Sequence, residues 1–422
     1  MRRDDGYTGR GIELKPTLAW VRNPSVMVLC PPEWYGASGV YNLPFLSSAE
    51  NDFAPDFEDH MKRKYLRSSH PPRSVNPDER NYYDHVHALY MVLVRSGGPD
   101  SILRRIREEV VQYRDYEIVH SGPFRGHYLA GHIRRASIPM ELSVVRRLYV
   151  QGLLEDYYFS GDRRSFDVAR EMADALLADS SRLPESYTWT ERTPAWTIMG
   201  LTSFYEATLE RKYLEAAKRV AGVMIEHQLR MAALYPNQGG VKGQTGGFLQ
   251  NRLGAWFDPD ESTASGAGSP FMTALLLEGM IKLYWLTGDE GNRGQGSGSR
   301  VQGGGEELRR SILAACDWLA DVAYEPKKSA FWYIARDPAN IELTPGLAPL
   351  FLQSLGFAYQ ATGEERFREI ARAILKDQDW GGHTKEFNQA MRTSGQGLLL
   401  LSKPPRTVSL TQPRTAQKVA RP

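Results

Sequence analysis

The sequence predicts an all-α fold, an (α/α) toroid of about five to six helical hairpins with an irregular N-terminal arm. Three observations predict this fold. One hairpin pattern recurs along the chain, the two helices of each hairpin differ in their apolar pattern, and glycine and proline stand at consistent places at the helix ends. Recurring units of this kind are typical of architectures in which neighbouring units bury each other's apolar faces.

The recurring pattern is an aromatic helix end, a short turn and a second helix. The turn usually pairs glycine with an acidic residue, as in SGD at 160–162. The copies span 92–114 (the weakest), 157–177, 205–225, 359–377, and a copy that starts at 284 and resumes after a glycine-rich insertion at 291–307. This self-similarity predicts a series of helical hairpins.

The two helices of a hairpin have different surroundings. In the second helix of the last copy, apolar residues recur at helical spacing, at Phe367, Ile370, Ala371, Ile374 and Leu375. Such an amphipathic helix covers a core with one face. The first helices are apolar on nearly all sides, over 142–159, 269–286 and 343–360. This alternation predicts two concentric layers, in which the enclosed helices form the inner ring.

Glycine and proline mark where these helices end and begin. Gly161, Gly288 and Gly363 follow predicted inner helices, where a left-handed residue commonly caps a helix. Pro194 and Pro270 stand where the first helical turn tolerates a residue without an N–H. Eleven helices are predicted between 79 and 403, which make five hairpins and one further helix. Either an N-terminal helix completes a sixth pair or the ring stays open.

The chain divides into three parts by composition. Residues 1–78 are rich in proline and are predicted to form an arm packed on the toroid. Residues 79–403 form the predicted toroid, which would be the catalytic domain. Residues 404–422 are predicted to be a disordered tail.

Charge and cysteine content argue against several classes of protein. The 52 basic and 50 acidic residues leave a net charge of +2, whereas nucleic-acid-binding proteins usually have a marked basic excess. The two cysteines lie far apart and outside any zinc-binding spacing. The sequence contains no apolar run of about 18 residues, so no membrane span is predicted. No signal-peptide core follows the N-terminus, so a cytoplasmic location is expected unless the sequence is part of a longer chain.

The aromatic residues favour a carbohydrate ligand. Several of the 9 tryptophans and 21 tyrosines lie beside glycine, proline or charged residues instead of in apolar runs. An aromatic ring in such a loop can stack on the apolar face of a sugar while polar neighbours bond its hydroxyls. The aromatic residues therefore predict a carbohydrate-binding cleft.

The long connections of the predicted toroid all run from an outer helix to the next inner helix. They span 115–140, 180–193, 231–265, 325–342 and 377–385. They would emerge on one rim, and loops on a rigid scaffold often bind substrates. The residues predicted to bind substrate at this rim are Tyr83, Trp189, Glu191, Arg192, Trp196, Asn237, Gln238, Trp256 and Trp332.

One of these loops gathers histidines and arginines. The stretch GPFRGHYLAGHIRRASIP at 122–139 holds two of the nine histidines of the chain, and His120 lies just before it. Glycine and proline are too frequent here for one continuous helix. The loop therefore concentrates residues suited to proton transfer and to binding anions.

The first part of the toroid resembles a known family. The segment from NYYDHVHALY to the histidine-rich loop, and YVQGLLEDYYFSGDRR at 149–164, are similar to the helical toroid of the exo-rhamnogalacturonan lyase-like (YetA-like) family. The resemblance covers about 79–180; beyond it the chain resembles the broader group of six-hairpin glycosidases and polysaccharide lyases. It implies a toroid with lyase activity. The chain departs from the family at RRLYVQGL, where Arg147 and Tyr149 replace a histidine–aromatic pair.

β-Elimination on a uronic-acid unit would use the residue types of the histidine-rich loop. The reaction removes the proton at C5, so a cation must neutralise the adjacent carboxylate and a histidine or tyrosine must take the proton. The predicted catalytic residues are His85, His127, Tyr128, His132, Arg134 and Arg135. Either histidine of the loop would be the base, the tyrosine its acid or base partner, and either arginine the carboxylate clamp.

Two other functions stay open at the level of sequence. A glycoside hydrolase would need carboxyl groups beside the scissile bond, and the candidates are Asp84, Glu141, Glu191, Asp258 and Asp260. A sugar-binding toroid without catalysis would carry aromatic residues on a shallow surface.

The ligands expected follow from the same residues. No cofactor or metal is predicted, with calcium at Asp258, Asp260 and Glu261 as the alternative. The expected partner is an acidic oligo- or polysaccharide, with no nucleic acid and no membrane. The oligomeric state stays open.

Overall fold

Helices make up nearly all of the regular structure in the computed structural model of the chain. The structure describes residues 29–38, 44–67, 81–97, 100–129, 147–181, 191–234, 268–287, 304–335, 342–376 and 384–405. Within these ranges the fold is all-α, as the sequence predicts.

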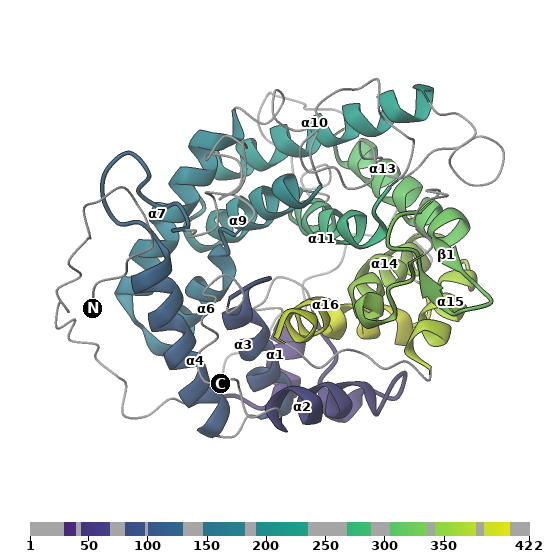
Figure 1. Cartoon of the computed structure of the whole chain (residues 1–422), viewed down its shortest axis with the longest axis horizontal. Coiled ribbons are helices and arrows are strands. Elements are labelled where there is room, and N and C mark those ends of the chain that lie inside the picture. Colours follow the sequence, from purple (N-terminus) through teal and green to yellow (C-terminus); the bar gives the residue numbers. More distant parts are fainter. Residues whose placement is uncertain are drawn as a thin grey trace, which may run out of the picture.

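Six helices in the described ranges form a closed inner ring (Figure 1). They are α3 (His85–Ser96), α6 (Val150–Ser160), α9 (Arg192–Thr208), α11 (Pro270–Thr287), α14 (Leu352–Thr362) and α16 (Thr384–Ser402). Each contacts the next in this order, and α16 contacts α3. Because these helices are apolar on most faces, they are enclosed on most sides: in α11 every residue from Pro270 to Leu283 is buried.

A second layer of helices covers the ring from outside (Figure 1). It consists of α4 (Asp100–Gln112), α7 (Arg163–Ser180), α10 (Arg211–Leu234), α13 (Gly304–Trp318) and α15 (Arg366–Leu375). Each packs against the inner helix that precedes it in the chain. In α15 all five residues of the predicted apolar stripe are buried. The predicted (α/α) toroid is confirmed.

The N-terminal arm occupies the sixth outer position. Its described helices are α1 (Pro32–Ser38), the 3-10 turn η1 (Ser48–Glu50) and α2 (Phe57–Arg67). Helix α2 contacts α16, and α1 contacts α3. A buried ion pair joins Glu58 of α2 to Arg95 of α3. Gly395 of α16 makes room for this pair, because a Cβ at that position would overlap the Arg95 guanidinium.

Several helices start or end with distinctive local geometry. The glycines at 161 and 363 are left-handed caps, with φ of 71° and 76°. Pro270 is the first residue of α11, and Pro194 lies in the first turn of α9. The predicted roles of these four residues are confirmed, whereas Gly288 lies outside the described residues.

Short irregular elements extend the outer layer. The π-helical segments η3 (Tyr113–Glu117) and η9 (Leu319–Ala323) continue α4 and α13, and the 3-10 segment η10 (Pro345–Phe351) leads into α14. After η9, the strands β1 (Tyr324–Glu325) and β2 (Ala330–Phe331) pair antiparallel, with Tyr324 opposite Phe331. Across the described ranges, no helix is both long and apolar enough to cross a membrane.

Candidate active site

The N-terminal ends of the inner helices gather on one rim of the toroid. Residues at the starts of several inner helices contact one another here: Tyr82, just before α3, contacts Arg192 of α9 and Lys385 of α16, and Tyr149, just before α6, contacts Trp196 of α9. This is the rim that the sequence predicts as the site. It also concentrates the positive ends of several helix dipoles, which favour a negatively charged ligand.

Tyr82 stands at this rim among three cations. The Nη1 of Arg192, the first residue of α9, donates to the Tyr82 hydroxyl at 2.5 Å. The guanidinium carbon of Arg147 lies 4.4 Å from the centroid of the Tyr82 ring. The Nζ of Lys385, in the first turn of α16, lies 5.8 Å from the same centroid. We call Tyr82, Arg147, Arg192 and Lys385 the rim cluster.

The rim cluster combines two chemical capacities. A tyrosine hydroxyl positioned beside a substrate can take part in proton transfer. A guanidinium also binds a carboxylate through two parallel N–H donors. Tyr82 is half-buried, whereas Arg147 and Arg192 are buried, so these charges act where water screens them less than at an open surface.

An aromatic layer lies directly beneath the rim cluster. The Tyr83 ring lies 4.6 Å from Tyr82 and 5.9 Å from Trp196, and Tyr149 lies 4.4 Å from Trp196, all between centroids. Burial raises the pKa of Tyr83, although Arg192 opposes the shift, and burial likewise raises the pKa of Tyr149 against Arg147. Both phenols therefore stay protonated near neutral pH and can serve as hydrogen-bond donors.

The chain reaches α3 through a strained turn. Tyr83 and Asp84 are consecutive left-handed residues, with φ of 65° and 60°, although neither is glycine. The Asp84 carboxylate caps α3 by accepting from the N–H of His87 at 3.3 Å, and it also accepts from the N–H of Gly152 at 3.1 Å. Gly152 permits this approach of α6, because a Cβ there would lie 2.5 Å from Asp84 Oδ1.

Burial also changes the acidity of Asp84. It raises the pKa of this carboxyl to about 6, although nearby Arg392 and the two backbone N–H donors oppose the shift. A carboxyl with such a pKa can hold or release a proton near neutral pH.

A buried charge network fills the ring below the aromatic layer. His87 Nδ1 lies 2.7 Å from Glu155 Oε1. Burial lowers the pKa of His87, helped by Arg392 and Lys282, and burial raises the pKa of Glu155. Both shifts favour the uncharged forms. Arg392 forms an ion pair with Glu278 across α16 and α11.

The structure attaches His127 to the outer layer. Its Nε2 lies 2.9 Å from the Asp179 carboxylate of α7, and its Nδ1 lies 3.1 Å from the carbonyl oxygen of Phe124. Burial alone would lower the pKa of His127, but the bonds to Asp179 and Phe124 raise it above its ordinary value. In its protonated form His127 donates to both partners, Asp179 and the Phe124 carbonyl oxygen.

Neighbouring residues of the loop are attached in the same way. His120 Nδ1 lies 2.9 Å from Glu171 of α7, and Arg125 donates to the same carboxylate at 3.0 Å. Tyr128 instead approaches the inner ring: it is buried, and its ring centroid lies 5.6 Å from the guanidinium carbon of Arg147. Arg147 thus contacts both Tyr82 and Tyr128.

The other described candidates lie beneath the rim. His85 is buried at the start of α3, with its Nδ1 2.6 Å from Asn388 Oδ1. Glu191 is buried at the N-terminus of α9 and accepts from Thr273 Oγ1 at 3.5 Å. Trp196 is only 2% exposed. Trp332 is half-buried and pairs with Leu343 in an isolated β-bridge.

The remaining candidates lie outside the described residues. They are His132, Arg134, Arg135, Trp189, Asn237, Gln238 and Trp256, together with the hydrolase candidates Glu141, Asp258 and Asp260 and the calcium candidate Glu261. In the described part of the chain, no three His, Cys, Asp or Glu side chains are arranged to hold a metal ion.

The structure brings forward residues that sequence reasoning did not select as site residues. Tyr82 and Lys385 belong to the rim cluster, and Arg147 was noticed only as a departure from the resembled family. Each lies at or just before the start of an inner helix. That position, together with the basic or aromatic residue type, is the signal that identifies them.

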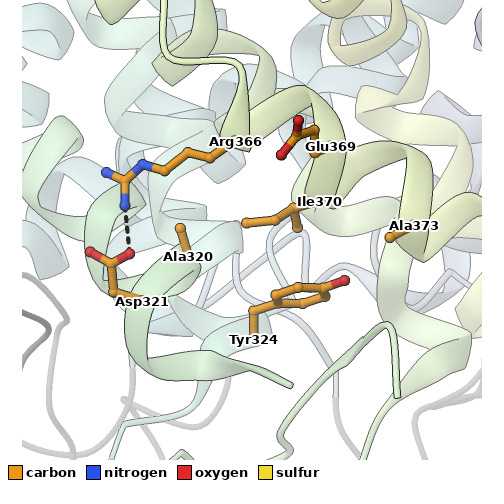
Figure 2. Close-up of a pocket in the computed structure, with 7 residues that line it drawn as sticks. All are labelled: Ala320, Asp321, Tyr324, Arg366, Glu369, Ile370 and Ala373. Atoms are coloured by element: carbon orange, nitrogen blue, oxygen red, sulfur yellow. Dashed lines mark hydrogen bonds and ion pairs between the residues drawn. The ribbon is translucent and has the colours of Figure 1, made fainter. Parts of the chain in front are cut away.

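A pocket of about 380 Å³ lies between η9 and α15 of the outer layer (Figure 2). It is lined by Ala320, Asp321, Tyr324, Arg366, Glu369, Ile370 and Ala373. Arg366 is bonded to the carboxylates of Asp317, Asp321 and Glu364. Its guanidinium therefore holds η9 against α15.

Solved structures similar to this chain share its helical architecture. A family 88 glycosyl hydrolase from Bacteroides vulgatus aligns with a TM-score of 0.55 over 84% of this chain and 99% of its own, at 11% identity. A polysaccharide lyase aligns with a TM-score of 0.54 over 82% of this chain and 98% of its own, at 10% identity. A sugar epimerase from a ruminal bacterium has a TM-score of 0.48, covers 78% of this chain and 77% of its own, and is 13% identical.

The likeness to the hydrolase and the lyase shows a shared fold. That fold is the (α/α) toroid. The chain matches no protein-family model and no curated protein. The resemblance to the exo-rhamnogalacturonan lyase-like family therefore stays a prediction, whereas the broader toroid architecture is confirmed.

Proposed function

We propose that this chain is a carbohydrate-active enzyme, a polysaccharide lyase that cleaves a uronic-acid-containing polysaccharide by β-elimination at the rim cluster. One observation carries the proposal: the Tyr82 hydroxyl accepts a hydrogen bond from Arg192 while Arg147 lies against the same ring. This contact supports the proposal, because it would put a proton acceptor beside two groups able to bind a carboxylate.

The reaction would follow from these roles. Arg192 and Arg147 would bind the substrate carboxylate and so acidify the C5 proton. The Tyr82 phenolate would take that proton, and the freed electron pair would form the C4=C5 double bond as the C4–O bond breaks. The leaving oxygen must then gain a proton, and Tyr128, on the other side of Arg147, is the proposed donor.

The rest of the histidine-rich loop keeps a place in this proposal. His132 is the alternative base, and Arg134 and Arg135 are further candidates for the carboxylate clamp. His127 has a different role here, because its Nε2 is bonded to Asp179 of α7 and its Nδ1 to the Phe124 carbonyl oxygen of the same loop. The similar toroids of a glycosyl hydrolase and a polysaccharide lyase support a sugar substrate, without deciding between the two reactions.

A glycoside hydrolase is the second candidate, favoured by Asp84. Burial raises the pKa of this carboxyl to about 6, which suits a general acid near neutral pH. Glu191, buried at the start of α9, would be the second carboxyl group. A sugar-binding toroid without catalysis is the third.

The decisive experiment is a screen of acidic polysaccharides followed in two ways. Ultraviolet absorbance detects the C4=C5 double bond of a lyase product, and a reducing-end assay detects any cleavage. Rising absorbance with new reducing ends supports the lyase. New reducing ends without absorbance would overturn it in favour of the hydrolase, and binding without either signal would favour the non-catalytic toroid.

Variants then test the rim cluster on the substrate that the screen identifies. We expect Tyr82→Phe to lower kcat at least about a hundredfold, because proton transfer by a positioned side chain typically contributes that much or more. Arg192→Lys should mainly raise KM for the acidic polymer, because a lysine cannot bind a carboxylate through two parallel donors. Tyr116→Phe, at an exposed tyrosine of η3, is the matched control. Full activity in Tyr82→Phe would remove Tyr82 from the mechanism.

A further inference from the structure

The turn that carries Tyr82 is held in place by the inner helix α16. The Nδ2 of Asn388 donates to the Tyr82 carbonyl oxygen at 2.6 Å, and the Nη1 of Arg392 donates to the Tyr83 carbonyl oxygen at 3.4 Å. Asn388 and Arg392 are four residues apart on α16, so they lie on the same helix face. Two successive carbonyls of the turn are thus bonded to two successive turns of α16.

The backbone of this turn needs such support. A left-handed conformation is unfavourable for a residue with a Cβ, and here Tyr83 and Asp84 both adopt it. Strained conformations of this kind persist only where the surroundings determine them, and they are frequent at active sites. Without the bonds from α16, the turn could relax and carry the Tyr82 ring away from Arg192.

The Asn388 amide has a fixed orientation. Its N–H donates to the Tyr82 carbonyl, so its oxygen faces His85 Nδ1 at 2.6 Å. The Nδ1 of His85 therefore carries the proton in this arrangement. His85 thereby connects the start of α3 to the residue that holds the turn before α3.

The Arg392 guanidinium is fixed as well. It bonds to both carboxylate oxygens of Glu278 on α11, and its central carbon lies 4.6 Å from the Trp196 ring centroid on α9. Arg392 is 1% exposed. One side chain of α16 therefore links the turn to two other inner helices.

We propose that Asn388 and Arg392 are positioning residues that hold the Tyr82 ring against Arg192. The proposal rests on the proposed function for its catalytic meaning, since neither residue would touch the reacting atoms. The position of Tyr82 can nevertheless be measured without any substrate, so the two proposals can fail separately.

The test is fluorine NMR on the full chain with 3-fluorotyrosine at position 82. The parent protein should give one narrow resonance. Asn388→Ala should broaden, split or shift it, because the Tyr82 carbonyl loses its donor. Asn388→Asp separates the two bonds of this residue: its carboxylate can still accept from His85 but cannot donate to the carbonyl, so we expect the same change.

Matched variants distinguish positioning from general loosening. Thr393→Val, at a buried residue of the same helix, should leave the resonance unchanged. Arg392→Lys should change it as Asn388→Ala does. If Arg392→Lys does not fold, the two Asn388 variants carry the test. A parent-like resonance in folded Asn388→Ala and Asn388→Asp would overturn the proposal.

Kinetics supply a second readout if the screen identifies a substrate. Asn388→Ala should lower kcat at least about tenfold and change KM little, because a displaced proton acceptor slows the chemical step more than binding. Unchanged kcat alongside a changed resonance would show that the bonds from Asn388 and Arg392 do not contribute to catalysis. If every acidic polysaccharide is inert, the proposed function fails while the NMR result still decides whether α16 holds Tyr82.

Discussion

Adjacent residues of the histidine-rich loop face different layers of the toroid. His127 bonds to Asp179 on outer helix α7, whereas Tyr128 lies beside Arg147 at the inner rim. Tyr128 pairs with Ile118 in an antiparallel bridge, and successive side chains of extended backbone point to opposite sides. Two of the clustered histidines, His120 and His127, thus attach the loop to α7.

The His127–Asp179 pair predicts a pH-dependent contribution to stability. The pKa of His127 is raised in the folded chain, so the contribution is fully present below its unfolded pKa of about 6.5 and is lost as pH rises through the folded pKa. We expect His127→Gln to lower the free energy of unfolding at pH 5.5 and to have a much smaller effect at pH 8.5. Urea unfolding of parent and variant at the two pH values measures this difference.

Asp179→Asn is the control for that assignment. Removing the carboxylate should produce a loss in the same pH window, and the double variant should lose little more than either single one, since both remove one interaction. An effect of His127→Gln that is equal at both pH values would show that packing, and not charge, determines the role of His127.

At the scale of elements, four of the inner helices in the described ranges end at a left-handed residue, and one of these four residues is not glycine. Helices α3, α6 and α14 end at glycines with φ between 65° and 76°, at Gly97, Gly161 and Gly363. Helix α9 ends at Leu209, which has φ of 59° and is 71% exposed. The repeated turn therefore imposes the same left-handed backbone whether or not the sequence supplies a glycine.

Leu209→Gly should consequently stabilise the protein. Glycine adopts this backbone without the penalty that a Cβ causes, and an exposed leucine loses little packing, so we expect a gain of about 1 kcal/mol in the free energy of unfolding. Gly363→Ala is the matched converse and should cost about 1 kcal/mol. Urea unfolding compares both variants with the parent chain. A loss of stability in Leu209→Gly would show that its side chain contributes packing that outweighs the strain.

At the scale of the whole molecule, the sequence predicts the architecture better than the site. Apolar periodicity and cap residues report local burial, so the stripe from Phe367 to Leu375 and the caps at Gly161 and Gly363 could be read directly. Whether the ring is open or closed could not be predicted from the sequence, because closure depends on the contact between α16 and α3, which are distant in the chain.

The site was harder to predict for a similar reason. The sequence predicts that Arg192 and Tyr83 lie at one rim, because helix starts and long loops identify it, and their role as site residues stays a prediction. The sequence did not show that Arg147 and Lys385 lie against the Tyr82 ring, since the three residues come from three separate segments. Nor could it show that His127 faces α7, because the direction of one side chain in a loop depends on its tertiary partner.

The contact between the arm and the inner ring leads to a final prediction. Glu58 and Arg95 are 2% and 1% exposed, and their ion pair joins α2 to α3. Removing one partner of a buried pair leaves the other charge without compensation, at a cost of about 3–5 kcal/mol. We expect Glu58→Gln to cause such a loss and to expose the arm to limited proteolysis before the toroid. Asp167→Asn, which breaks an exposed pair with Arg163, should change stability by less than about 1 kcal/mol.

The double variant Glu58→Gln/Arg95→Met decides whether the ion pair or the packing of the whole arm holds α2 against α3. If the ion pair couples α2 to α3, the double variant should lose clearly less stability than the two single losses added together, because it leaves no buried charge behind. Arg95→Met keeps a long apolar side chain beside Phe45, whose ring centroid lies 5.8 Å from the Arg95 guanidinium carbon. Additive losses would instead mean that packing alone holds the arm in the sixth position.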